Sequence, residues 1–332
     1  MEVERVLLAE PRGFCAGVEM AIKSLAWMVR IFDPPIYCYH EIVHNQTVVE
    51  RFRKAGVVFV DDLSLVPPGS PIMLSAHGAA PAVVAEARRR GSTVVNAVCP
   101  LVTKVHHELK VRAAGGYSIL YVGHHGHEEA EGTVAEAPDA VRFVETEADV
   151  DVLSETDAPV ALLAQTTLSH DEWAGVVERA RTRFPELWMP GRSDLCYATT
   201  NRQAALKALA SRADAVVVIG SSNSSNTMAL MRVAKAAGCP RVYRVNRAGE
   251  LPSDLSGTVG VTAGASAPEE LVRAVLERLS PRSGTEVVKV TDEDEYFRLP
   301  AELRALVPEA TSDDRLVRAS DALDALANGW DG

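Results

Sequence analysis

The chain has 332 residues, which suggests two or three domains, and 47% of them are hydrophobic, which excludes a disordered or collagen-like chain. Its 34 basic and 45 acidic residues give a net charge of −11, which argues against a protein that holds nucleic acid by general attraction to phosphate. The charge is uneven, because the stretch from 291 to 332 holds eleven acids and only four arginines.

Short β-branched runs alternate with Ala-rich amphipathic stretches along the chain. In chain order the pattern predicts strand 6–9, helix 18–31, strands 57–60 and 72–75, helix 80–89, strand 93–96, helix 103–113, strands 119–122 and 160–164, helices 170–184 and 204–210, strand 215–219, helix 225–237, strands 242–245 and 259–262, and helix 268–279. Uninterrupted apolar strands between helices are typical of parallel sheets buried on both faces, so we expect an α/β fold.

The first residues carry acids where a secretory signal carries bases, and no segment approaches the ~18 uncharged apolar residues of a membrane span. We therefore expect a soluble, cytoplasmic protein that binds neither membrane nor nucleic acid. The five cysteines are an odd number in a large chain, and in a reducing compartment we expect thiols, metal ligands or catalytic groups rather than disulfides.

Three cysteines occupy equivalent positions in the sequence. Cys15, Cys99 and Cys196 each lie between a strand-like run and a helix-like run. The strand-like run before Cys196 is 187–189. The three cysteines are separated from one another by 84 and 97 residues. Ligands of open α/β sheets bind outside the carboxyl ends of the strands, so three such turns can present three thiolates to one place. Cys38 and Cys239 lack this context, and we expect them to be structural.

The repeat predicts three pseudo-repeated α/β domains. We expect domain 1 at 1–97 with Cys15, domain 2 at 98–193 with Cys99 and domain 3 at 194–280 with Cys196. A C-terminal segment with an acidic tail follows at 281–332.

Three thiolates are compatible with two kinds of metal centre. A catalytic zinc ion takes three protein ligands and keeps one position for water. A [4Fe–4S] cluster with three thiolates has one iron that lacks a protein ligand and can bind substrate. The spacing of the cysteines does not choose between them.

Polar side chains follow several of the predicted strands. His77 and His127 have glycine beside them, and His44 lies in a similar segment. The Ser/Asn run at 221–226 opens a helix, where hydroxyl and backbone N–H groups favour an anion. The chain has no P-loop motif and no G-x-G-x-x-G, so these groups suit a compact diphosphate better than a nucleotide in a P-loop or Rossmann site.

The following motifs resemble, in order, those of the 4-hydroxy-3-methylbut-2-enyl diphosphate reductase family, also called IspH or LytB: PRGFCAGV at 11–18, EIVHN at 41–45, SAHG at 75–78, CPLVTKVH at 99–106, QTTLS at 165–169, CYATTNRQ at 196–203 and TAGASAP at 262–268. The likeness covers roughly residues 3 to 280. It implies a trefoil of three α/β domains around one central [4Fe–4S] cluster per chain. It also implies reduction of the allylic diphosphate to isopentenyl and dimethylallyl diphosphate, the last step of the non-mevalonate isoprenoid pathway.

The resemblance also implies roles for individual residues. The cluster ligands are expected to be Cys15, Cys99 and Cys196. The proton donor is expected to be Glu129. The substrate-binding set is expected to be His44, His77, His127, Thr166, Ser224, Ser225, Asn226 and Ser266, with Thr166 orienting the proton relay. Ferredoxin or flavodoxin is the expected electron donor, although no motif encodes the choice.

The chain departs from the family pattern in two places. The family usually reads G-H-x-G-H-P-E, and Glu128 stands here in place of the proline. The residues beyond about Arg298 match nothing in the family, and we expect them to form a solvated extension.

Other functions share some of these features. Quinolinate synthase also joins three α/β domains around a three-cysteine cluster but needs no net electrons, and a hydro-lyase using the open iron is a broader version of the same alternative. A non-enzymatic iron–sulfur or zinc module would leave the carboxylate beside His127 and the Ser/Asn run without a role. Consumption of reducing equivalents separates the reductase from these alternatives.

Overall fold

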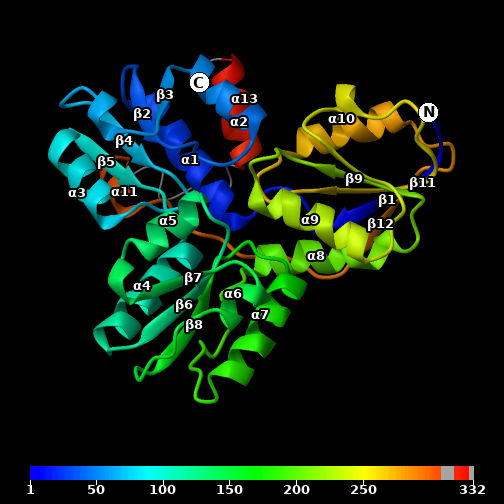
Figure 1. The fold of residues 1–332 in the computed structure, drawn as a ribbon. Helices are drawn as coiled ribbons and strands as arrows, with labels where there is room; N and C mark the ends of the chain where they lie inside the picture. Colours follow the sequence, from blue (N-terminus) through cyan, green and yellow to red (C-terminus); the bar gives the residue numbers. More distant parts are fainter. Residues whose placement is uncertain (308–317, 329–332) are drawn as a thin grey trace.

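Three parallel sheets, each in its own lobe, form the framework of the chain (Figure 1). The computed structural model describes residues 1–307 and 318–328. Every pairing between neighbouring strands of a sheet is parallel, so the expected α/β class is confirmed. Strands such as β8 (Val160–Ala164) and β9 (Ala215–Ile219) are buried at every position, as strands covered on both faces must be.

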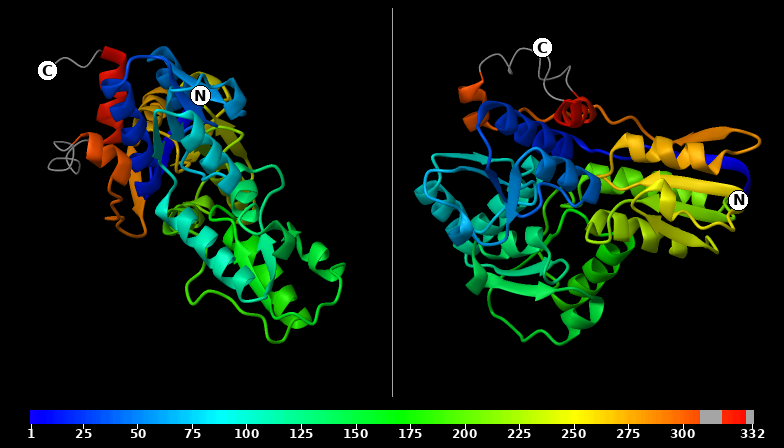
Figure 2. Two further views of the ribbon diagram at one scale, coloured as in Figure 1. Left: turned by 90° about the vertical axis from the view of Figure 1, so that its left-hand side faces the viewer. Right: turned by 90° about the horizontal axis from the view of Figure 1, so that it is seen from above.

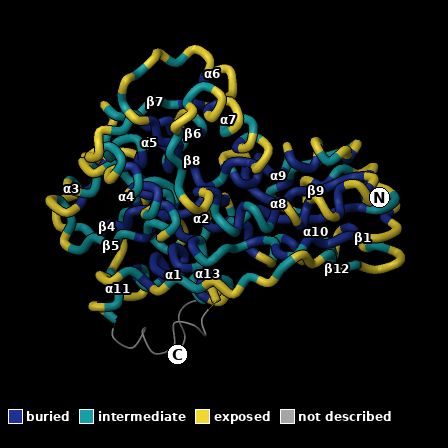
Figure 3. The backbone as a smooth tube through the Cα atoms, turned by 90° about the horizontal axis from the view of Figure 1, so that it is seen from below, coloured by how far each residue is buried: buried dark blue, intermediate teal, exposed yellow. Residues whose placement is uncertain are grey.

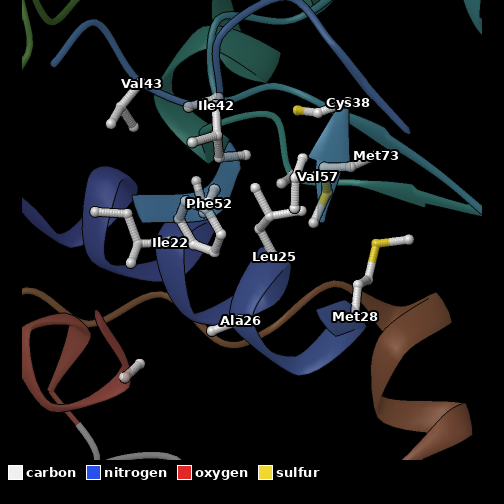
Figure 4. Packing of buried hydrophobic residues seen from close by; sticks show 14 of the residues in the cluster. Ile22, Leu25, Ala26, Met28, Cys38, Ile42, Val43, Phe52, Val57 and Met73 are labelled. Carbon is white, nitrogen blue, oxygen red and sulfur yellow. The ribbon is translucent and has the colours of Figure 1, made fainter. Parts of the chain in front are cut away.

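The first lobe contains a four-stranded sheet in the order β3-β2-β4-β5. Its elements are α1 (Ala16–Ile31), β2 (Ile36–Tyr39), α2 (Gln46–Lys54), β3 (Val57–Val60), the 3₁₀ helix η1 (Leu63–Leu65), β4 (Pro71–Leu74), α3 (Pro81–Arg90) and β5 (Thr93–Asn96). Helix α1 packs its buried face on the sheet. In Figure 4, Ile22 and Leu25 of α1 lie beside Phe52 of α2, in the cluster that also holds Cys38 and Met73.

The second lobe contains a three-stranded sheet in the order β7-β6-β8. Its elements are α4 (Pro100–Ala114), β6 (Ser118–Val122), α5 (Glu128–Val134), η2 (Pro138–Ala140), β7 (Val141–Val144), α6 (Glu147–Asp151), β8 and α7 (His170–Arg183). The strand-like run at 187–189 forms only a single bridge, between Trp188 and Ala161 of β8.

The third lobe contains a five-stranded sheet in the order β10-β9-β11-β1-β12. Its elements are β1 (Glu2–Glu10), α8 (Tyr197–Ala210), β9, α9 (Ser225–Ala236), β10 (Val242–Val245), η3 (Ala248–Glu250), β11 (Ser256–Ala263), α10 (Glu269–Leu279) and β12 (Thr285–Lys289). Figure 3 shows the buried residues running through this sheet and the helices beside it.

The membership of the third sheet differs from the expected division of the chain. Strand β1 lies between β11 and β12, so it leaves the expected domain at 1–97, and β12 leaves the expected C-terminal segment at 281–332. A buried apolar strand fits any parallel sheet, and the sequence therefore does not show which one β1 joins. We propose a division that keeps the boundaries after 97 and 193 and adds β1 and β12 to the third unit.

The described part of the C-terminal tail packs on the first lobe, which corrects the expectation of a solvated extension beyond Arg298. Helices α11 (Ala301–Leu306) and α13 (Ala319–Asn328) lie beside α1, and Figure 2 shows α13 next to it. Leu303 and Leu323 are fully buried in the core of the first lobe. The reason is an apolar stripe at the spacing of one helix face, made by Ala319, Ala322, Leu323 and Leu326. Residues 308–317 and 329–332 lie outside the described part of the chain.

Polar contacts fix the same helix. The backbone N–H of Ala319 donates to Oε2 of Glu19 at 3.1 Å, and Arg51 pairs with Asp324 at 3.5 Å.

No helix in the described ranges is long and apolar enough to cross a membrane.

We predict that Leu323→Ala destabilises the protein by about 2–5 kcal/mol, because it leaves a cavity in a closed core. The measurement is the free energy of unfolding in urea. Leu306→Ala is the matched control, since Leu306 is 44% exposed and its truncation should cost no more than about 0.5 kcal/mol. Equal free energies of unfolding for the two variants would contradict the packing of α13 and favour a solvated tail.

Candidate functional site

One cavity at the meeting point of the three lobes is lined by all of the residues singled out in the sequence. These are Cys15, His44, His77, Cys99, His127, Glu129, Thr166, Cys196, Ser224, Ser225, Asn226 and Ser266. They come from loops and helix starts that are far apart in the chain. The geometry brings the whole set together, and the role of each member stays a prediction.

Each of the three cysteines is the N-cap residue of a helix, at a turn where the chain passes between lobes. Cys15 joins β1 of the third lobe to α1 of the first, Cys99 joins β5 to α4 of the second, and Cys196 leads into α8 of the third. Helices α4 and α8 begin earlier than predicted, at Pro100 and Tyr197, directly after their cysteines. Proline is favoured at a first helical position because its missing N–H has no partner there.

The backbone N–H of each cysteine donates to a carbonyl in a loop that follows a strand. The bonds are Cys15 to Ala265 at 3.3 Å, Cys99 to Ala76 at 3.0 Å and Cys196 to Thr166 at 3.1 Å. These loops follow β11, β4 and β8, one strand from each lobe. Each thiol is therefore fixed at the carboxyl end of a parallel sheet, where ligands of α/β folds bind.

The three thiols lie close enough to affect one another. A Cβ atom added to Gly17 would lie 2.7 Å from Sγ of Cys99 and 4.0 Å from Sγ of Cys15, so only glycine fits between them. Burial, followed by the charge of Cys15, raises the pKa of the Cys196 thiol to about 11 and raises the pKa of Cys99 further. A positively charged group among the three sulfurs would lower the pKa of Cys99 and Cys196 again and favour their thiolate forms.

This donor set fits a thiolate-bound metal centre that has fewer than four protein ligands. Cys38 and Cys239 are buried in hydrophobic cores, in the first and third lobes, so neither can serve as a fourth ligand. All five cysteines are free. Soft sulfur ligands without carboxylates select iron–sulfur centres or zinc over magnesium or calcium.

A buried carboxyl, that of Glu129, faces the same cavity. The N–H of Thr166 donates to Oε1 of Glu129 at 2.7 Å, and Oγ1 of Thr166 lies 3.0 Å from Oε2. Burial raises the pKa of Glu129 to about 7, although both contacts with Thr166 act in the opposite direction. A diphosphate in the cavity is therefore not needed to keep this carboxyl protonated near neutral pH.

Three histidines form one wall. The rings of His44 and His77 stack with centroids 4.0 Å apart, and His127 meets both edge-on. Nδ1 of His127 accepts the N–H of Glu129 at 3.2 Å. Burial, followed by the charges of His77 and His44, lowers the pKa of His127 to about 3. His127 is therefore neutral, with its proton on Nε2.

The N-terminus of α9 faces the cavity from the third lobe. Ser224 caps this helix, and Ser225 and Asn226 are its first two residues. Oγ of Ser266 donates to the carbonyl of His44 at 2.9 Å and so ties the third lobe to the first. Within the described residues the cavity lining includes no Lys or Arg, so an anion would meet imidazole, hydroxyl and amide donors and a helix N-terminus.

Some residues that support the site had no role in the sequence analysis. Phe297 lines the cavity from the segment after β12, where no motif marks it. Thr199 contacts Sγ of Cys196 through its N–H at 3.3 Å and its hydroxyl at 3.0 Å. Thr199 lies inside the motif around Cys196, so its position was visible but its contact was not.

Arg202 is fully buried and connects three segments. Its Nη2 and Nε donate to the carbonyl of Gly13 at 2.7 and 3.0 Å, and its Nη1 donates to Ala198 at 2.9 Å. Nη1 also pairs with Oε1 of Glu293 at 2.9 Å. The turn that carries Cys15 is thus bonded to α8 and to the C-terminal segment.

Comparison with known proteins agrees with the resemblance seen in the sequence. The 4-hydroxy-3-methylbut-2-enyl diphosphate reductase of Mycolicibacterium paratuberculosis is 49% identical over 308 residues, which cover 91% of this chain and 93% of the relative. The solved structure of the E-1-hydroxy-2-methyl-but-2-enyl-4-diphosphate reductase from Plasmodium falciparum superposes with a TM-score of 0.88 at 32% identity, covering 94% of this chain and all of that one.

A second solved structure is described as (E)-4-hydroxy-3-methyl-but-2-enyl diphosphate reductase, the terminal enzyme of the non-mevalonate pathway. It superposes with a TM-score of 0.60 at 29% identity and covers 83% of this chain and 99% of its own. A family model described as LytB protein matches residues 6–280. This chain therefore belongs to the LytB protein family.

Proposed function

We propose that this chain is a 4-hydroxy-3-methylbut-2-enyl diphosphate reductase. It removes the allylic hydroxyl of its substrate as water, consumes two electrons and two protons, and releases isopentenyl and dimethylallyl diphosphate as the last step of the non-mevalonate pathway. The observation that carries the proposal is one cavity that combines three thiols, a carboxyl with a raised pKa and an anion-binding wall.

The cofactor in this proposal is one [4Fe–4S] cluster per chain, held by Cys15, Cys99 and Cys196. The fit is supported by the cradle at Gly17 and by the absence of a fourth cysteine near the three. When bound, such a cluster supplies electrons one at a time and an iron without a protein ligand as Lewis acid.

Glu129 supplies the proton that turns the departing hydroxyl into water. The N–H of Thr166 occupies Oε1, so a neutral Glu129 carries its proton on Oε2 and faces the hydroxyl of Thr166. Proton transfer through this hydroxyl lets one carboxyl reach the substrate oxygen without leaving its buried position. An acid is needed because hydroxide is a poor leaving group.

Several donors to the diphosphate need no charge on a side chain. His127 offers the N–H of its Nε2, and α9 offers its first backbone N–H groups with the hydroxyls of Ser224 and Ser225. His44, His77, Asn226 and Ser266 complete the proposed set. An anion fixed here leaves the allylic end of the substrate directed toward the cysteines.

The electrons must come from outside the chain, because the reaction consumes two of them per turnover. We propose a one-electron carrier protein, ferredoxin or flavodoxin, as the donor, and the cytoplasm as the compartment.

The decisive experiment is an anaerobic assay of the reconstituted protein with the allylic diphosphate and a strong one-electron donor. We expect both isopentenyl and dimethylallyl diphosphate, with two electrons consumed per product. Dehydration or condensation without electron consumption would instead favour a hydro-lyase or a quinolinate synthase. A zinc-loaded protein without visible absorption would remove the reductase proposal.

We predict that Cys15→Ser, Cys99→Ser and Cys196→Ser each lower the bound iron and sulfide strongly, because each removes one of only three protein ligands. The measurement is iron and acid-labile sulfide per chain after anaerobic reconstitution. Cys38→Ser is the control and should keep its cluster, since this thiol lies in the core of the first lobe. Loss of cluster in the control alone would contradict the assignment.

We predict that Glu129→Gln lowers kcat by roughly 10²–10⁴-fold, the usual cost of losing a general acid. Cluster content should be unchanged, which separates the loss of the proton from damage to the site. Glu131→Gln, an identical change at an exposed position of the same helix, should behave as wild type. Normal turnover of Glu129→Gln would place the proton donor elsewhere.

We predict that kcat falls as the pH rises above about 7, because Glu129 then loses the proton that it must donate. A raised pKa means that the acid form is present below this value and disappears above it. The check is a pH profile of kcat at saturating substrate. The residual rate of Glu129→Gln should lack this decline, and a decline of the same shape in that variant would assign it to another group.

A further inference from the structure

A second carboxylate, that of Glu128, lies among the histidines of the cavity wall. Oε2 of Glu128 lies 2.9 Å from Nδ1 of His77, and Oε1 lies 3.6 Å from Nδ1 of His40. Neither Oε2 of Glu128 nor Nδ1 of His77 has another polar partner among the described residues. The two atoms are in ion-pair contact without the alignment of a regular hydrogen bond.

This contact determines which nitrogen of His77 carries a proton. Burial tends to raise the pKa of Glu128, but His77, His44 and His40 outweigh it and lower the pKa to about 2, so Glu128 is ionised. An ionised carboxylate only accepts hydrogen bonds, and a bare ring nitrogen at 2.9 Å would repel it. Nδ1 of His77 therefore carries a proton.

A neutral His77 protonated on Nδ1 then has no N–H on Nε2 to donate to an anion. With its single proton on Nδ1, its Nε2 has only a lone pair, and the oxygens of a diphosphate also have only lone pairs. His127 has the opposite arrangement, because its Nδ1 accepts from Glu129 and its Nε2 carries the proton while the ring is neutral. The two histidines of one wall are thus fixed in opposite tautomers.

The other charged groups around His77 do not remove this conflict. His44 stacks on it and pairs with Glu41 at 3.5 Å, while His127 is edge-on at 6.1 Å. Behind Glu128, His40 lies 3.1 Å from the exposed Asp61. Behind the loop of His77, His106 pairs with Glu136 at 2.8 Å. None of these contacts places a second carboxylate or a base on Nε2 of His77.

We propose that Glu128 is a positioning residue that couples substrate binding to proton uptake, because His77 can donate to the diphosphate only as an imidazolium with protons on both nitrogens. The inference rests on the proposed function, since it takes the diphosphate as the ligand of this wall. Glu128 holds one proton of the ring, and the bound anion stabilises the other. Substrate binding is then accompanied by uptake of a proton from solvent, so binding weakens as the pH rises.

The variant that tests this is Glu128→Pro. Glu128 is the first residue of α5, where proline is favoured, and the preceding His127 has the extended backbone that a following proline requires. Without the carboxylate, neutral His77 is free to move its proton to Nε2 and to donate without proton uptake. Glu131→Gln is the control, because it removes one negative charge from an exposed position of the same helix.

The measurement is binding of the allylic diphosphate to anaerobically reconstituted holoenzyme by calorimetry between pH 7 and pH 9, in buffers of different ionisation enthalpy. Wild type and Glu131→Gln should take up about one more proton per bound substrate than Glu128→Pro, and their Kd should rise up to about tenfold more per pH unit. Ionisation of the diphosphate itself is common to all three proteins and cancels. At the basic end Glu128→Pro should bind more tightly than wild type, and KM should follow Kd while kcat changes little.

Three outcomes are distinguishable. Equal proton uptake and parallel pH profiles in wild type and Glu128→Pro would overturn the inference while leaving the reductase intact. His44, His77 and Glu128 also have ligand atoms within 4.8 Å of one another, so a divalent ion retained by wild type and lost in Glu128→Pro would overturn it in favour of a metal site. Absence of binding and turnover in all three reconstituted proteins would instead remove the proposed function.

Discussion

The junction of the first and third lobes depends on the buried guanidinium of Arg202. This side chain belongs to the helix after Cys196, yet it is bonded to the turn before Cys15 and to Glu293 of the returning C-terminal segment. Burying a cation is unfavourable unless its N–H groups are hydrogen-bonded. Loss of one partner of Arg202 would therefore leave a buried donor unpaired and would weaken the whole set of contacts. Since the cysteines stand where the chain passes between lobes, a shift at one crossing would carry one sulfur away from the other two.

Two adjacent carboxyl groups, those of Glu128 and Glu129, differ in pKa because their surroundings differ. Both begin the same short helix, but one points among imidazoles and has a pKa near 2, while the other points into a buried pocket and has a pKa near 7. The first is a permanent acceptor and the second a potential acid. A helix turns its successive residues toward different surroundings, which is enough to separate the two roles.

Local sequence patterns predicted much of the fold and of the candidate site. The pattern of strand, turn and helix around Cys15, Cys99 and Cys196 is contiguous in sequence, so both the α/β class and the turns could be inferred. The place of β1 could not, because its partners β11 and β12 lie at the other end of the chain. The stripe that packs α13 was present in the sequence, but the surrounding acids favoured a solvated tail. The contact of Glu128 with His77 joins two lobes, and no periodicity or spacing reports it.

The position of β1 in the third sheet has a consequence for biosynthesis. Its residues are translated long before the two strands that flank it, β11 and β12. The sheets of the first two lobes are complete once β8 has been translated, but the strand that leads to Cys15 remains without a partner strand until β11 emerges. A group that needs all three sulfurs can therefore be held by all of them only after β11 has been translated, late in the synthesis of the chain.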